Sequence, residues 1–149
     1  MMKQLEPLLK TLDETYAKAP ALPKKWKDLL VTYAPWLSLI GGVLLVFGAI
    51  SLFGLGSFLS PFSMMAGAGG FVITWVIAAV LLLVAGVLEF LAFAPLKARK
   101  EKGWNLLFYA LLLNTLGSLV RLNVSEVVTA VITFLIAYYF LYQVKSYYK

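Results

Sequence analysis

The chain has 149 residues, of which 62% are hydrophobic and 13% charged, and its mean hydropathy is +0.88. Because about a quarter of the residues in a soluble domain are charged, this composition excludes an ordinary water-soluble fold and indicates an integral membrane protein. The sequence contains no Cys and no His, which excludes disulfides, thiolate metal sites and the commonest general base. We therefore expect no catalytic residue, no metal and no cofactor, and the protein is predicted not to be an enzyme.

The first 34 residues are predicted to form an N-terminal amphipathic segment at the membrane surface. Its apolar residues recur at helical spacing and charged residues fill the other positions, which predicts a short amphipathic helix ending before Pro20 and Pro23. A second stretch over residues 24–33 leads to Pro35, where the first span is expected to begin. Two uses remain open: the helix lies in the headgroup layer, or it docks onto a partner protein.

Two long apolar runs follow, and each is long enough to cross a bilayer core of about 30 Å. Residues 35–59 carry no charge, and residues 68–96 carry only Glu89. The connection over residues 54–70 is rich in glycine and contains Pro61, so it is expected to be a flexible turn outside the membrane.

Two further spans are predicted after the basic stretch at residues 97–102, over residues 104–121 and 125–144. Residues 35–149 are therefore expected to form one four-span transmembrane domain. The predicted fold is all-α: a four-helix transmembrane bundle in which neighbouring helices run in opposite directions.

Basic residues predict the orientation of this bundle in the cell (inner) membrane. Twelve of the 13 Lys and Arg residues flank the spans on one side, and Arg121 alone lies on the other. Because basic flanks stay in the cytoplasm, both termini are predicted to be cytoplasmic. The net charge of +6 is attributed to topology and to anionic lipids rather than to nucleic acid. The residues expected to contact anionic lipid are Lys24, Lys25, Lys27, Lys97, Arg99, Lys100 and Lys102.

Each predicted span has one stripe of small or polar residues and one face of large apolar residues. Because lipid is as apolar as leucine, helices in membranes associate where small residues let their backbones approach. The stripes are therefore expected to meet in the centre of the bundle. The residues predicted to pack helices together are Gly41, Gly42, Gly48, Ala78, Ala85, Gly86 and Gly117.

Glu89 is the candidate for a ligand or proton site, because ionisable residues within spans usually face an interior partner. It lies eight residues before Lys97, about 12 Å along a helix. Counting to the same depth in the last two spans predicts a polar cluster of Glu89 with Asn114 and one of Tyr138 and Tyr139. This cluster is interpreted first as a structural hydrogen-bonded group and second as a proton or cation site.

At the opposite end, Asn123 and Glu126 stand three apart before an apolar run, which resembles a capping box. Arg121 is expected to pair with Glu126 across this turn.

For the function, we expect a non-catalytic accessory or scaffold subunit that binds lipid or another membrane protein, or a second copy arranged in parallel. The alternative is a small oligomeric transporter or channel that uses Glu89. A lipid-modifying enzyme is disfavoured because no cluster of acids or phosphate ligands is evident.

Overall fold

The computed structural model describes residues 2–67, 69–120 and 124–149. It is 90% helical, with no strand in the described residues. The helices are α1 (Met2–Tyr16), α2 (Lys24–Met65), α3 (Gly69–Lys97), α4 (Glu101–Val120) and α5 (Val124–Val144), followed by a 3₁₀ turn, η1 (Lys145–Tyr147).

Four of these helices, α2 to α5, are long and apolar enough to cross a membrane. This finding confirms the predicted all-α four-helix bundle and a multi-pass membrane protein. The predicted spans over residues 104–121 and 125–144 agree closely with α4 and α5.

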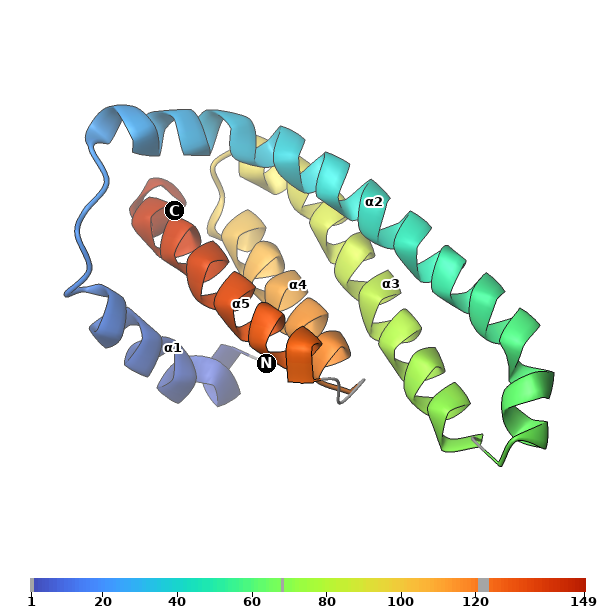
Figure 1. Cartoon of the computed structure of the whole chain (residues 1–149). Helices are drawn as coiled ribbons and strands as arrows, with labels where there is room; N and C mark the ends of the chain where they lie inside the picture. The colour runs from blue at the N-terminus through green and yellow to red at the C-terminus, as the bar shows by residue number, and fades with distance from the viewer. Residues whose placement is uncertain (1, 68, 121–123) are drawn as a thin grey trace.

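Pro35, the predicted start of the first span, lies inside α2, so the helix begins before the predicted span. The stretch over residues 24–33 and the first span form one helix, which changes direction along its first third (Figure 1). A proline inside a helix removes one backbone hydrogen bond and produces a bend without ending the helix. The Ser38 hydroxyl donates to the carbonyl oxygen of Pro35 at 2.8 Å.

The predicted flexible turn over residues 54–70 was also wrong in extent. Helix α2 continues to Met65 through Pro61, and α3 begins at Gly69. Gly67 has a φ of +73°, a conformation that glycine adopts without steric cost. Helix is favoured over a long loop here because an apolar segment in lipid must satisfy its own backbone groups.

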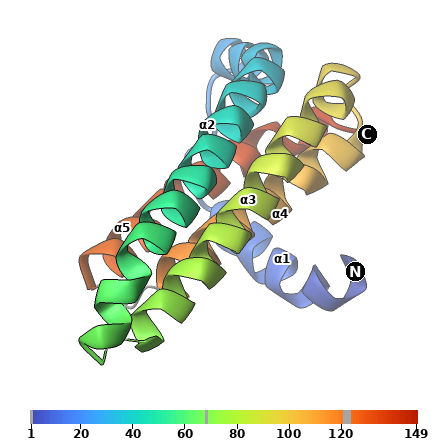
Figure 2. The ribbon, with the colours of Figure 1, turned by 90° about the vertical axis from the view of Figure 1, so that its right-hand side faces the viewer.

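The four long helices pack in chain order, α2 on α3, α3 on α4 and α4 on α5. We call the end that holds Lys24, Lys97 and Lys145 the basic end. There α2 and α5 also approach each other, and Figure 1 shows that they diverge toward the opposite end. The α2–α3 hairpin extends beyond the ends of α4 and α5 (Figures 1 and 2).

Two glycines allow the backbones of α2 and α3 to touch. A Cβ atom placed on Gly42 would lie 2.7 Å from the carbonyl oxygen of Gly86 and 2.7 Å from the backbone nitrogen of Phe90. A Cβ on Gly86 would lie 2.9 Å from the carbonyl oxygen of Gly42. The fit is looser at Gly48, where a Cβ would lie 3.4 Å from Leu82 Cδ2, and at Gly117, where a Cβ would lie 3.5 Å from the carbonyl oxygen of Ala78. Ala78 and Ala85 are also buried, and Gly41 of α2 faces Glu89 of α3.

The hydrophobic core lies at the basic end and is mainly aromatic. Phe108 is fully buried between Trp104, with ring centroids 5.7 Å apart, and Tyr138, also at 5.7 Å. The Trp104 indole donates a hydrogen bond to the carbonyl oxygen of Leu141 at 2.9 Å, and the Lys145 ammonium lies 5.0 Å from its ring centroid. These contacts fix α4 against α5.

The N-terminal helix α1 packs against α5. Asp13 accepts a hydrogen bond from the Tyr138 hydroxyl and forms an ion pair with Lys145. The Tyr16 hydroxyl donates to the carbonyl oxygen of Leu135 at 2.9 Å, and burial raises the pKa of Tyr16. Leu9 is buried in the aromatic core. The apolar side of α1 is therefore covered at Leu9 by the chain itself.

Candidate functional site

Glu89 lies on the stripe of α3 that faces the interior of the bundle. Its carboxylate occupies the space that a side chain on Gly41 would need, because a Cβ atom there would collide with Glu89 Oε2. The glycine on α2 thus makes room for the acid on α3.

A cavity of about 250 Å³ adjoins this carboxylate. Its walls come from four helices and from the chain after α5, and most of them are apolar. The lining residues are Leu30, Ala34, Leu37, Ser38, Glu89, Leu107, Ala137, Phe140, Leu141, Val144 and Tyr148. We call this space the Glu89 cavity.

Two other polar side chains line the Glu89 cavity, and sequence reasoning missed both. Ser38 is buried and donates to its own helix, as described above. Tyr148 is 5% exposed, and its hydroxyl is buried with no hydrogen-bond partner in the described residues. Burial raises the pKa of the Tyr148 hydroxyl by more than the nearby Arg99 lowers it. The hydroxyl is therefore a neutral donor. No charge pattern in the sequence signals either residue.

The predicted cluster of Glu89 with Asn114 is wrong. Asn114 does not line the Glu89 cavity; it lines a separate cleft of about 290 Å³ between α4 and α5. The residue of α4 that lines the Glu89 cavity is Leu107, seven residues before Asn114. The reason is the tight packing of Gly103, whose Cβ would lie 2.6 Å from the backbone nitrogen of Leu96. Helix α4 therefore starts level with the end of α3, which places Glu89 level with Ala110, about one turn before Asn114.

The predicted tyrosine member of the cluster is also wrong. The Tyr138 hydroxyl bonds to Asp13, and the Tyr139 hydroxyl donates to the carbonyl oxygen of Pro20 at 2.6 Å. Both side chains face the N-terminal segment, although they lie at the right depth. Their neighbours Ala137 and Phe140 face Glu89 instead, because successive helical residues are about 100° apart.

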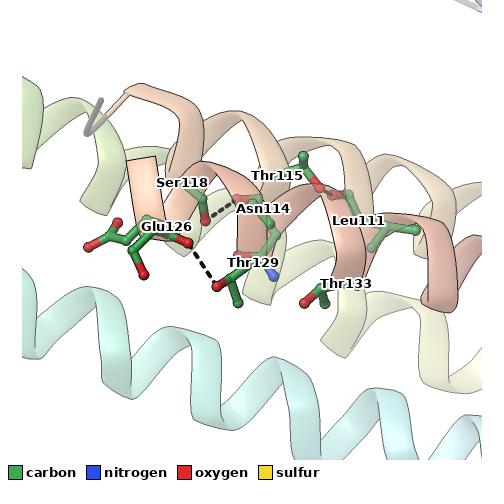
Figure 3. A pocket seen from close by; sticks show the side chains of 9 residues that line it. Leu111, Asn114, Thr115, Ser118, Glu126, Thr129 and Thr133 are labelled. Carbon is green, nitrogen blue, oxygen red and sulfur yellow. Dashed lines mark hydrogen bonds between the residues drawn. The ribbon is translucent and has the colours of Figure 1, made fainter. Parts of the chain in front are cut away.

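The cleft between α4 and α5 is lined mainly by polar side chains (Figure 3). We call it the α4–α5 cleft. Its lining residues are Leu111, Asn114, Thr115, Ser118, Ser125, Glu126, Thr129, Ala130 and Thr133. The small-residue stripes of the two predicted spans thus border a space rather than closing onto each other.

Several hydroxyls in the α4–α5 cleft bond within their own helices. Thr115 donates to the carbonyl oxygen of Leu111 at 2.8 Å, and Ser118 donates to that of Asn114 at 3.2 Å. Thr129 donates to the carbonyl oxygen of Ser125 at 2.8 Å. In the part of the chain that the structure describes, the side chains of Asn114 and Thr133 have no hydrogen-bond partner. These two groups are available to a ligand or a partner.

The two cavities lie one helical turn apart. Leu111 and Thr133 line the α4–α5 cleft, and Leu107 and Ala137 line the Glu89 cavity. Four residues of helix correspond to about 6 Å.

The predicted Asn123 cap and the predicted Arg121 pair with Glu126 lie outside the described residues, because residues 121–123 are not described. The basic residues predicted to contact lipid lie at the basic end, and all are exposed except Lys27, which is partly exposed. Within residues 2–67, 69–120 and 124–149, no group of three or more acidic side chains is placed to hold a metal ion.

Comparisons of the chain with protein families, with characterised proteins and with solved structures find no match.

Proposed function

We propose that the chain is a non-catalytic accessory or scaffold subunit of the cell membrane that binds a transmembrane helix of another protein through the α4–α5 cleft. In this proposal both termini are cytoplasmic, and the exposed lysines of the basic end contact anionic lipid. The observation that supports it is the pair of unpartnered polar groups, Asn114 and Thr133, in a cleft between two spans.

The physical reason is the cost of polar groups in hydrocarbon. Lipid cannot hydrogen-bond, so an amide exposed to it is unfavourable. A helix that offers a Ser, Thr, Asn or Gln side chain would satisfy Asn114, and such bonds contribute about 0.6 kcal/mol each in membranes. Thr133 is exposed, so the cleft is open to a neighbour.

Photo-crosslinking in native membranes tests this proposal. A benzophenone amino acid at Thr133 should give an adduct of defined mass with one membrane protein. The matched control is the next residue, Ile132, which is 51% exposed on another face of α5 and should give adducts with lipid only. Asn114→Leu should remove the protein adduct. Equal crosslinking from both positions, or lipid adducts alone from Thr133, would refute the proposal.

A second candidate function is a small transporter or channel, and one observation favours it. The α4–α5 cleft and the Glu89 cavity follow each other along α4 and α5 with one turn between them. Together they would give a partly polar route that contains one acid near the basic end.

Proteoliposomes loaded with a pH-sensitive dye test this second candidate. Proton or cation flux in the parent protein that disappears in Glu89→Gln would support transport. An absence of flux in the parent protein, with correct insertion verified, would reject it.

A further inference from the structure

We propose that the Glu89 cavity binds a small organic ammonium ion that carries an apolar group. The inference is independent of the helix-binding proposal, because the two cavities have no lining residue in common.

The carboxylate is the first reason. Of the residues that the structure describes, Glu89 is the single acid that lines the cavity, and no Lys or Arg among them lines it. Among the described residues Glu89 has no hydrogen bond or ion pair. An ionised carboxylate at this depth is costly without a partner of opposite charge. A ligand that brings a positive charge compensates it, and the charge-assisted hydrogen bond between them is stronger than a neutral one.

The Tyr148 hydroxyl is the second and independent reason. Among the described residues this buried hydroxyl has no hydrogen-bond partner, and Tyr148 lines the same cavity. A buried hydroxyl normally finds a hydrogen-bond partner, and because this oxygen is shielded from the cavity space, an occupant would supply one after a small rotation of the Tyr148 side chain. Tyr148 and Phe140 also line the cavity, and aromatic residues attract cations.

The apolar walls select the kind of cation. Ca²⁺ and Mg²⁺ take about six or more oxygen ligands, whereas the described side chains that line this cavity supply oxygen only from Glu89, Ser38 and Tyr148. The remaining lining side chains are hydrocarbon, which favours a ligand with an apolar body. The volume of about 250 Å³ is below the range of roughly 300–1,000 Å³ typical of drug-sized ligands, so the occupant is small.

Binding of tritiated 2-phenylethylammonium to the full chain in lipid nanodiscs tests the proposal, with empty nanodiscs correcting for partition into lipid. Saturable binding is expected, and unlabelled 2-phenylethanol, a neutral molecule of similar shape, should compete at least about tenfold more weakly because it lacks the charge. Glu89→Gln should weaken binding by at least about tenfold. Tyr148→Phe should weaken it by about two- to tenfold.

Matched controls separate the site from general effects. Glu101→Gln makes the same chemical change at an exposed position outside the cavity and should bind like the parent. Ala137→Leu fills the cavity and should abolish binding with Glu89 intact, whereas Ile136→Leu, on the exposed face of α5, should not. Equal competition by the neutral alcohol, unchanged binding in Glu89→Gln, or no saturable binding to the folded parent would overturn the proposal.

Discussion

The contact between Gly42 and Gly86 gives the sharpest stability prediction. In Gly42→Ala, the new methyl group would lie 2.7 Å from two atoms, the carbonyl oxygen of Gly86 and the backbone nitrogen of Phe90. Neither is a flexible side chain, so α2 and α3 must separate by several tenths of an ångström. Overpacking of this kind costs about 1–3 kcal/mol. We expect the upper part of that range because backbone atoms cannot rotate away.

Gly54→Ala is the matched control on the same helix, since a Cβ atom at Gly54 meets nothing within 4 Å. Alanine in place of a helical glycine stabilises by about 0.5–1 kcal/mol. The same gain partly offsets the collision at Gly42, which leaves a net loss of about 2 kcal/mol there. The two variants should therefore differ by about 3 kcal/mol in free energy of unfolding.

The assay is unfolding of the purified protein in mixed micelles, with SDS as denaturant and far-UV circular dichroism as signal. Both variants must first give the parent spectrum in mild detergent. If Gly42→Ala proves as stable as Gly54→Ala, the backbone contact between α2 and α3 does not hold, and the reasoning fails.

Three further predictions concern the basic end. Phe108→Ala should lower the free energy of unfolding by about 3–5 kcal/mol. Phe47→Ala, at a side chain that is 64% exposed, should change it by about 0.5 kcal/mol or less. The same SDS titration measures both variants, and equal losses would contradict the location of the core. Because burial raises the pKa of Tyr16 above the usual 10.0, the stabilisation of docked α1 is complete below pH 10 and is lost as pH rises through the raised pKa. Proteolysis of the N-terminal segment against pH should show this loss in the parent, and a Tyr16→Phe variant with the same profile would refute it. Asp13→Asn removes the ion pair with the partly exposed Lys145, which contributes up to about 1 kcal/mol. Proteolysis of the N-terminal segment should therefore become only severalfold faster. At high salt the difference between parent and variant should be smaller.

The number and type of spans could be predicted from sequence because length and hydropathy are sufficient for them. The ends of α2 could not, since Pro35 and Pro61 are both accommodated inside the helix. Proline and glycine end helices in water, where a loop can be solvated, but lipid leaves helix as the better way to satisfy the backbone.

The candidate site was predicted in part. The position of Glu89 on the inward stripe followed from helical periodicity alone. Its neighbours depend on where α4 begins and on the rotation of α5 about its axis, and hydropathy specifies neither. The close packing of Gly103 on Leu96 determines the first. The rotation of α5 coincides with the hydrogen bonds from Tyr138 and Tyr139 to the N-terminal segment. These are long-range contacts that periodicity does not encode.

The unequal lengths of the helices affect how the bundle is accommodated in a bilayer. At 1.5 Å per residue, the 29 residues of α3 measure about 43 Å and the 20 residues of α4 about 30 Å. The hydrocarbon layer is about 30 Å thick, so α4 matches it and α3 exceeds it. Phe58, Phe62 and Met65 near the tip of the hairpin are apolar and exposed, which makes projection into water unfavourable. A helix that is longer than the hydrocarbon layer can tilt to fit it. The thickness of the surrounding membrane should therefore change the angle between the long α2–α3 hairpin and the short α4–α5 hairpin.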